Sequence, residues 1–67
     1  GDMEFLGVYT DGRECFAFYL RECRGYYELW RERRDGSPPV FGEREVYYIS
    51  YIKEVLLRQL TRFRRVE

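Results

Sequence analysis

The sequence contains no histidine and only two cysteines, Cys15 and Cys23. A structural zinc site normally uses four nitrogen or sulfur ligands, which this composition cannot supply. The serine–histidine and cysteine–histidine pairs that activate most nucleophiles are missing for the same reason. We therefore expect no metal site, no catalytic residues and no small-molecule cofactor.

Long apolar runs are also missing, because no stretch approaches the roughly 18 residues of a membrane-spanning helix. The first residues, Gly1, Asp2 and Met3, lack the basic and apolar regions of a secretory signal. We interpret Gly1 and Asp2 as the remnant of an expression vector before a native Met3. From these features we expect no membrane partner.

The two cysteines lie eight residues apart in the sequence. If the residues between them form one strand, about 26 Å separates the two α-carbons. A disulfide requires α-carbons within about 7 Å of each other, so an intrachain bridge is then excluded. Two unpaired thiols in a short chain favour the reducing cytoplasm.

The residues that are present form an electrically neutral chain of 67 residues, with 12 basic and 12 acidic side chains and 45% hydrophobic content. This composition predicts one folded domain over residues 1–67. A domain of this size has a small core, so we expect a homodimer. The charge is uneven, because residues 1–30 sum to −3 and residues 31–67 sum to +3.

Three runs rich in aromatic and apolar residues predict three consecutive strands: MEFLGVYT, RECFAFYLRE and YYELWRERR. Asp11-Gly12 separates the first two runs and predicts a two-residue hairpin loop, because both residues tolerate positive φ. That loop places Phe5 opposite Phe18 on one face of the sheet.

The second turn is predicted at Cys23-Arg24-Gly25, as a three-residue loop with a left-handed glycine. In this register Phe18 lies opposite Trp30. The alternative is a two-residue Arg24-Gly25 loop, which shifts the strand by one residue and moves Trp30 to the other face. We disfavour that alternative because it would require a positive φ at Arg24.

The segment Asp35-Gly36-Ser37-Pro38-Pro39 predicts a loop that continues through Gly42. EREVYYI predicts a fourth strand, and Ser50 is a candidate cap for a helix through SYIKEVLLRQLTRFRR. Apolar residues at helical spacing form one stripe on that helix: Ile52, Val55, Leu56, Leu60 and Phe63. The predicted fold is α+β, a four-stranded antiparallel β-sheet (β-β-β-β-α) with one C-terminal amphipathic helix.

In these registers one sheet face is apolar and carries the helix, through Met3, Phe5, Phe16, Phe18, Leu20 and Trp30. The opposite face alternates tyrosine and arginine, which stack on bases and pair with phosphates. The candidate nucleic-acid-binding residues are Tyr19, Arg21, Tyr27, Arg31 and Arg33. The same residue types are enriched at protein–protein interfaces, and the neutral total charge weakens the argument for nucleic acid.

The stretch ECFAFYLRECRGYYELWRERRDGSPPVFGEREVYYISYIKEVLLRQL resembles the transcriptional positive-coactivator family of single-stranded-DNA binders and the related Pur-alpha and Whirly folds. The resemblance lies in an aromatic strand pair, a charged strand leading into a Gly/Pro loop, a short strand and an amphipathic helix. It implies a sheet that holds single strands, through Tyr19, Arg21, Tyr27, Arg31 and Arg33. It also implies dimerisation through Leu56, Leu60 and Phe63. The chain departs from that family in having a single lysine and no basic excess.

Three functions therefore remain open. The first is a non-catalytic homodimer that binds single-stranded DNA or RNA in transcription regulation. The second is a small protein-interaction module, such as a phage, virus or archaeal accessory protein, that uses the same face on a protein partner. The third is a toxin-type ribonuclease in which arginine, tyrosine or glutamate performs acid–base chemistry without histidine.

Overall fold

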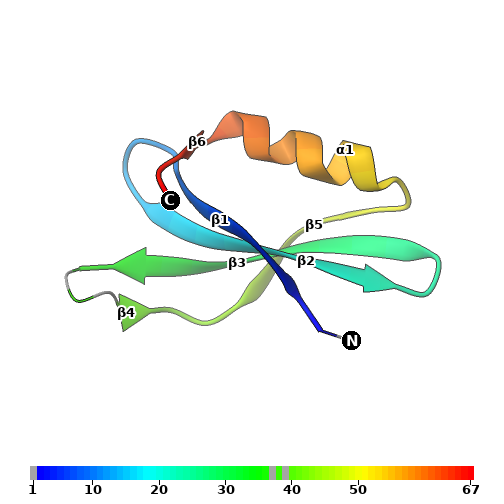
Figure 1. Ribbon diagram of the computed structural model, residues 1–67, viewed down its shortest axis with the longest axis horizontal. Helices are drawn as coiled ribbons and strands as arrows, with labels where there is room; N and C mark the ends of the chain where they lie inside the picture. The colour runs from blue at the N-terminus through cyan, green and yellow to red at the C-terminus, as the bar shows by residue number, and fades with distance from the viewer. Residues whose placement is uncertain (1, 37, 39) are drawn as a thin grey trace.

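The structure, a computed structural model, describes residues 2–36, 38 and 40–67, so that Gly1 of the predicted vector remnant lies outside it. Five strands come first: β1 (Glu4–Thr10), β2 (Cys15–Cys23), β3 (Tyr26–Asp35), β4 (Val40–Phe41) and β5 (Glu45–Ser50). A short helical region and a last strand follow: α1 (Lys53–Arg58), the 3-10 helix η1 (Gln59–Arg62) and β6 (Arg64–Arg65). Figure 1 shows α1 lying across one face of the sheet.

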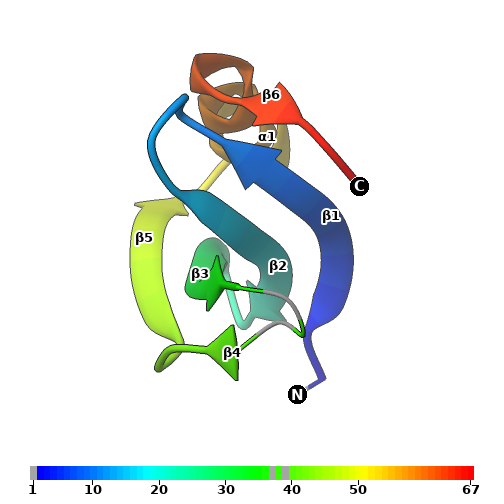
Figure 2. The ribbon, with the colours of Figure 1, turned by 90° about the vertical axis from the view of Figure 1, so that its left-hand side faces the viewer.

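The strands form one antiparallel sheet in the order β4-β3-β2-β1-β6, with β5 also paired to β3. β4 and β5 share the edge of β3 that β2 leaves free. The twisted sheet is seen from its end in Figure 2, with β1 and β5 on opposite sides and α1 above. An α+β fold with an antiparallel sheet and a C-terminal helix is confirmed. The predicted number of four strands is wrong, because the predicted loop contains β4 and the predicted helix ends in β6.

The helix is shorter at both ends than the sequence predicts. Ser50 does not occupy the N-cap position, although its Oγ accepts a hydrogen bond from the Ile52 N–H at 3.0 Å. At the other end Phe63 is extended, with φ −124° and ψ 163°. The Val8 N–H then donates to the Glu67 carbonyl at 2.8 Å. Beyond the helix the chain pairs with β1 and gives backbone groups at the edge of that strand their hydrogen-bond partners.

The first hairpin has a four-residue loop that begins at Asp11, and the predicted two-residue loop is wrong. Asp11 Oδ1 accepts hydrogen bonds from the backbone N–H groups of Arg13 at 2.8 Å and Glu14 at 2.9 Å. A carboxylate that binds the backbone in this way stabilises a wider turn. As a result Gly7 lies opposite Phe18, two positions from the predicted register.

A β-bulge then interrupts the pairing of β1 with β2. Gly7 pairs with Phe18 and Phe5 pairs with Tyr19, which leaves Leu6 as the extra residue. An extra residue reverses the alternation of side chains from that point onward. The side chain of Phe5 therefore lies on the face away from α1, whereas the sequence analysis had placed it beneath the helix.

The second turn contains two residues, Arg24 and Gly25, and the preferred three-residue loop is wrong. Cys23 pairs with Tyr26 across the turn. Gly25 has φ +87°, and no described residue other than glycine has a positive φ. A type II turn needs a positive φ only at its second central residue, so the objection to Arg24 does not apply. The one-residue change places Trp30 on the face away from α1.

The core lies between α1 and one sheet face, and its buried members are Phe16, Phe18, Leu20, Leu29 and Leu56. Phe63 packs its ring 5.1 Å from that of Phe18 and 5.7 Å from that of Tyr47, measured between centroids. Each buried side chain of this size stabilises the fold by roughly 1.5–3 kcal/mol. Cys15 and Cys23, at opposite ends of β2, are both free thiols.

The described part of the chain contains no helix that is long and apolar enough to cross a membrane.

The bulge depends on Gly7, and replacing that glycine tests its role. Gly7 has φ +131°, and a Cβ at this position would lie 2.9 Å from the carbonyl oxygen of Glu67. Gly12 is a matched control, because it has φ +97° and no neighbour within 4 Å. We expect Gly12→Ala to cost only the backbone strain, on the order of 1–3 kcal/mol, and Gly7→Ala to cost clearly more in urea unfolding. Equal losses would show that the contact with Glu67 is unimportant.

Candidate functional site

The predicted nucleic-acid-binding residues do not share one surface. Tyr19 and Arg21 lie on the face away from α1, which we call the open face, whereas Tyr27, Arg31 and Arg33 lie on the face that carries the helix. The one-residue change of register between β2 and β3 separates them. The single tyrosine–arginine face predicted from the sequence does not form.

The three residues on the helix side make contacts within the fold. Tyr27 packs against the core. The guanidinium of Arg31 lies 4.2 Å from the centroid of an aromatic ring of the core and pairs with Glu45 at 3.0 Å. Arg33 pairs with two carboxylates, at 2.9 and 3.6 Å. These residues hold the helix side of the sheet together.

The predicted dimerisation stripe also packs within its own chain. Leu56 is 0% exposed, and Leu60 and Phe63 pack against the same core. A partner could reach Leu56 only if α1 moved away from the sheet. Ile52, at the start of the stripe, is 56% exposed. Dimerisation through these residues stays a prediction.

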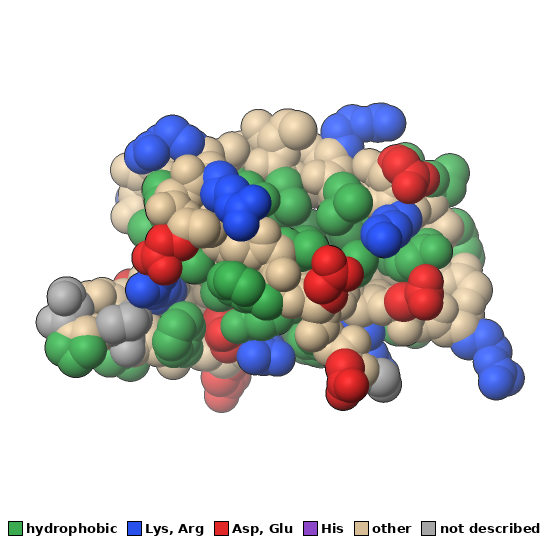
Figure 3. All heavy atoms as spheres, in the orientation of Figure 1, with side chains coloured by type: hydrophobic (Ala, Val, Ile, Leu, Met, Phe, Trp, Pro, Cys, Tyr) green, Lys and Arg blue, Asp and Glu red, His purple; other side chains and the backbone are tan. Residues whose placement is uncertain are grey.

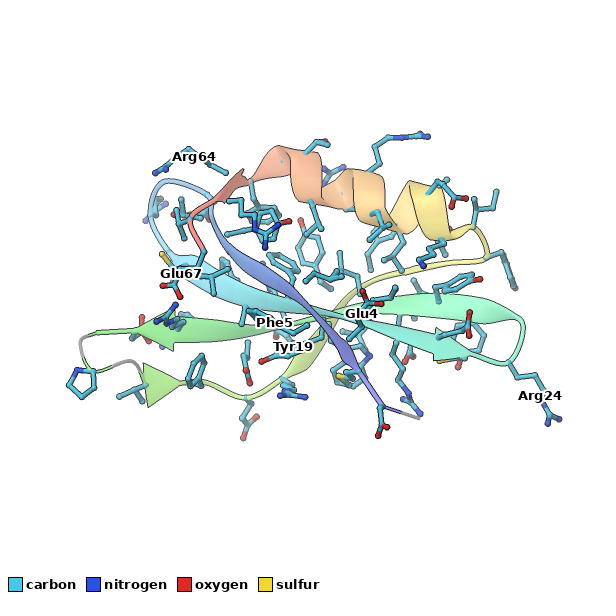
Figure 4. All side chains as sticks on the ribbon, viewed as in Figure 1. Glu4, Phe5, Tyr19, Arg24, Arg64 and Glu67 are labelled. Atoms are coloured by element: carbon cyan, nitrogen blue, oxygen red, sulfur yellow. The ribbon has the colours of Figure 1, made fainter. Side chains whose placement is uncertain are left out.

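A continuous row of apolar and aromatic side chains crosses the open face. It consists of Phe5, Tyr19, Trp30 and Val46, each directly opposite the next on β1, β2, β3 and β5. Phe5 and Val46 are 55% and 41% exposed, and the two central residues are half-buried. Figure 4 shows Phe5 and Tyr19 side by side, with 5.6 Å between their ring centroids. We call these four residues the open-face row.

A buried carboxylate stands on one side of the row. Glu28 Oε1 accepts hydrogen bonds from Trp30 Nε1 at 3.1 Å, Arg21 Nη1 at 3.3 Å and Cys23 Sγ at 3.4 Å. The hydrogen bond from Trp30 lowers the pKa of Glu28 below its ordinary value, and those from Cys23 and Arg21 add to this effect. The Glu28 carboxylate therefore fixes the indole ring of Trp30 in the row.

A second buried carboxylate, Glu32, stands on the other side of the row. Its Oε1 accepts a hydrogen bond from the Tyr19 hydroxyl at 2.5 Å, and its Oε2 accepts one from Arg44 Nε at 3.2 Å. The Arg44 guanidinium lies 4.0 Å from the centroid of the Tyr19 ring, so it forms a layer over the open face. Burial and the hydrogen bond to Glu32 raise the pKa of Tyr19, which keeps its hydroxyl protonated as a donor.

The charges beside the row cancel. Arg21 and Glu28 flank it on one side, and Arg44 and Glu32 flank it on the other. Mixed charge is also seen on the side of the molecule that carries β1 and α1, where Figure 3 shows basic and acidic side chains interspersed among hydrophobic ones. The open-face row therefore offers an apolar contact surface, and the ion pairs on its two sides have no net charge.

A shallow hollow of about 350 Å³ lies next to Glu28 and is lined by Tyr26, Glu28, Ile49, Ser50 and Tyr51. Within the described residues, no three His, Cys, Asp or Glu side chains come together as a metal site.

No protein-family model matches this chain, and no curated protein or solved structure matches it either.

The sequence predicts Tyr19 of the open-face row as a binding residue but does not predict the surface that the row forms. Two signals in the sequence point to this surface. The alternative two-residue Arg24-Gly25 loop places Trp30 opposite Tyr19. A glycine inside a strand, such as Gly7, often marks a bulge, and the bulge brings Phe5 to the same face.

The lowered pKa of Glu28 predicts a loss of stability in acid. A depressed folded-state pKa contributes stability that is complete above the ordinary value of 4.5 and is lost as the pH falls through the folded value. We expect the free energy of unfolding to fall more steeply below about pH 4.5 in the wild type than in Glu28→Gln. Urea unfolding followed by the fluorescence of Trp30, the only tryptophan, measures this. Identical pH profiles would contradict the assignment.

Proposed function

We propose that this chain is a non-catalytic protein-interaction module and that the open-face row is its binding surface. The observation that carries the proposal is a continuous line of four apolar and aromatic side chains outside the core, half-buried at its centre and with about half of Phe5 and of Val46 exposed at its ends. Single exposed apolar residues are normal on a monomer, whereas contiguous ones mark interaction sites. An aromatic centre with a polar border is the usual anatomy of a protein interface.

Electrostatics favour a protein over single-stranded nucleic acid as the partner. Aromatic residues on an open sheet could stack on bases, but affinity for nucleic acid depends on basic groups that neutralise phosphates. Arg21 and Arg44 are already paired with Glu28 and Glu32. A phosphate at the row would lie beside two carboxylates, so nucleic-acid binding in transcription regulation receives no support from this face.

The absence of catalysis is part of the same proposal. Arginine, tyrosine and glutamate, the residue types considered for acid–base chemistry without histidine, do lie on the open face, but they are engaged with one another. Arg21 pairs with Glu28, and Tyr19 donates its hydroxyl to Glu32. Both glutamates already accept hydrogen bonds from neighbouring side chains. The arrangement thus suits a structural role better than the ribonuclease chemistry considered from the sequence.

Photo-cross-linking tests the proposal. Phe5 is replaced with a photoreactive phenylalanine, and the control carries it in place of Arg24, which Figure 4 shows at the far tip of the β2–β3 turn. In cells of the source organism, we expect position 5 to give a covalent adduct with one defined protein, identified by peptide sequencing. Position 24 should give none. Cross-linking at position 5 to nucleic acid, or to nothing, would overturn the proposal.

An oligonucleotide titration tests the nucleic-acid alternative directly. Trp30 lies at the centre of the row, so a base stacked there would quench its fluorescence. We expect no saturable quenching by a single-stranded DNA or RNA oligonucleotide at low salt. Saturable quenching that disappears as salt is added would instead support the function implied by the family resemblance.

A further inference from the structure

We infer that a second copy of this chain covers the open face, in a dimer whose two-fold axis runs parallel to the strands, between β2 and β3. The inference rests on the proposed function, because it names the occupant of the same surface. It differs from the dimer predicted from the helix stripe, which would leave the open-face row uncovered.

The order of residues in the row carries the argument. With the axis in this position, each residue of one copy lies opposite a particular residue of the other copy. For a residue on β2 or β3, that residue is the one of the same kind and number as its neighbour across the β2–β3 pair of its own sheet. Tyr19 then faces Trp30 of the partner subunit, and Phe5 faces Val46 of the partner subunit. A two-fold interface repeats each arrangement twice, so each residue of the row in both copies lies opposite an apolar or aromatic residue of the other copy.

The charged residues beside the row are complementary under the same symmetry. Arg21 is the cross-strand neighbour of Glu28, so it faces Glu28 of the partner subunit. Arg44 lies over Tyr19 of β2, and β2 faces β3 of the second copy. Arg44 therefore comes close to Glu32 of the partner subunit. Opposite charges therefore meet on both sides of the row, which fixes the register of the two copies.

The symmetric arrangement in which the strands of the two copies run in opposite directions is unfavourable. A two-fold axis perpendicular to the strands, along the row, would reverse the strand direction of the second copy. Glu28 would then face Glu32 of the partner subunit, and this contact of like charges would occur twice. Because both glutamates are buried, such a contact would be poorly screened.

The layer formed by Arg44 fits between the two sheets. Facing sheets pack about 10 Å apart. The guanidinium lies 4.0 Å from the centroid of the Tyr19 ring, and an aromatic ring of the second copy on its far side would make a second contact of the same kind. In the dimer that ring is Trp30 of the partner subunit, within the roughly 6 Å range of a cation–π contact. The total charge of zero means that two copies do not repel each other.

Two substitutions that introduce opposite charges, at positions that face each other across the dimer, test this register. Phe5→Lys and Val46→Glu change side chains that are 55% and 41% exposed, so both variants should keep the fold, as checked by circular dichroism. Sedimentation equilibrium up to about 1 mM covers the weak range of small interfaces. We expect the wild type to reach twice its mass of 8.3 kDa. Each variant alone should weaken the dimer by at least about 30-fold, because the two-fold symmetry places the introduced charge at two positions of the interface.

Mixing the two variants should restore the dimer. In a mixed dimer the introduced lysine faces the introduced glutamate, and the other half of the interface keeps its original contact between Phe5 and Val46. A mixture that stays monomeric would overturn this register. A wild type that is monomeric at every concentration would overturn self-association altogether.

A matched control separates this dimer from the one predicted from the helix. Ile52→Lys makes the same chemical change at a residue that is 56% exposed, at the start of α1. We expect this variant to dimerise as the wild type does. Loss of the dimer in Ile52→Lys, with none in Phe5→Lys, would assign the dimer to the helix side and overturn the inference.

The cross-linking experiment at position 5 distinguishes failure of this inference from failure of the proposed function. An adduct between two copies of the chain supports both. An adduct with a different protein keeps the open face as a binding surface but overturns the second copy as its occupant. No protein adduct at position 5 overturns both.

Discussion

The Arg24-Gly25 turn fixes the register of β2 against β3, and both faces of the sheet depend on that register. With Cys23 opposite Tyr26, the aliphatic residues Leu20 and Leu29 meet beneath α1. On the other face the same register aligns Tyr19 with Trp30. A shift of one residue would exchange the faces of every side chain on β3, so this short turn decides which residues form the core.

The open face combines apolar exposure with satisfied polar groups. Glu28 and Glu32 are buried, and an unpaired buried carboxylate would be costly. Each carboxylate accepts hydrogen bonds from an arginine and from an aromatic residue of the row. The cost of burying these charges is thereby offset, and the aromatic side chains are held in fixed positions. A surface ordered in this way loses little side-chain entropy when it binds.

Local sequence patterns predicted the elements well and their pairing poorly. The three long strands and β5 lie where alternating aromatic and apolar residues placed them, because burial on a pleated sheet imposes that pattern. The registers depended on the lengths of two turns, which the strand patterns do not determine. At Asp11 the side chain favoured the wider turn, and at Gly25 one glycine was sufficient for the tighter one. The prediction of the candidate site was wrong for the same reason. A shift of one residue in the register of β2 against β3 places Tyr19 and Tyr27 on opposite faces of the sheet.

The pairing of β1 with β6 has a consequence for the order in which the molecule can assemble. Tyr9 pairs with Arg65, about 55 residues later in the chain. At roughly 5–20 residues per second, a ribosome needs several seconds to synthesise that interval. During this time the outer edge of β1 has no strand beside it, although β2 can already pair with the other edge. The nascent sheet therefore passes through a stage with an open edge, which closes only after Arg64 and Arg65 have been synthesised.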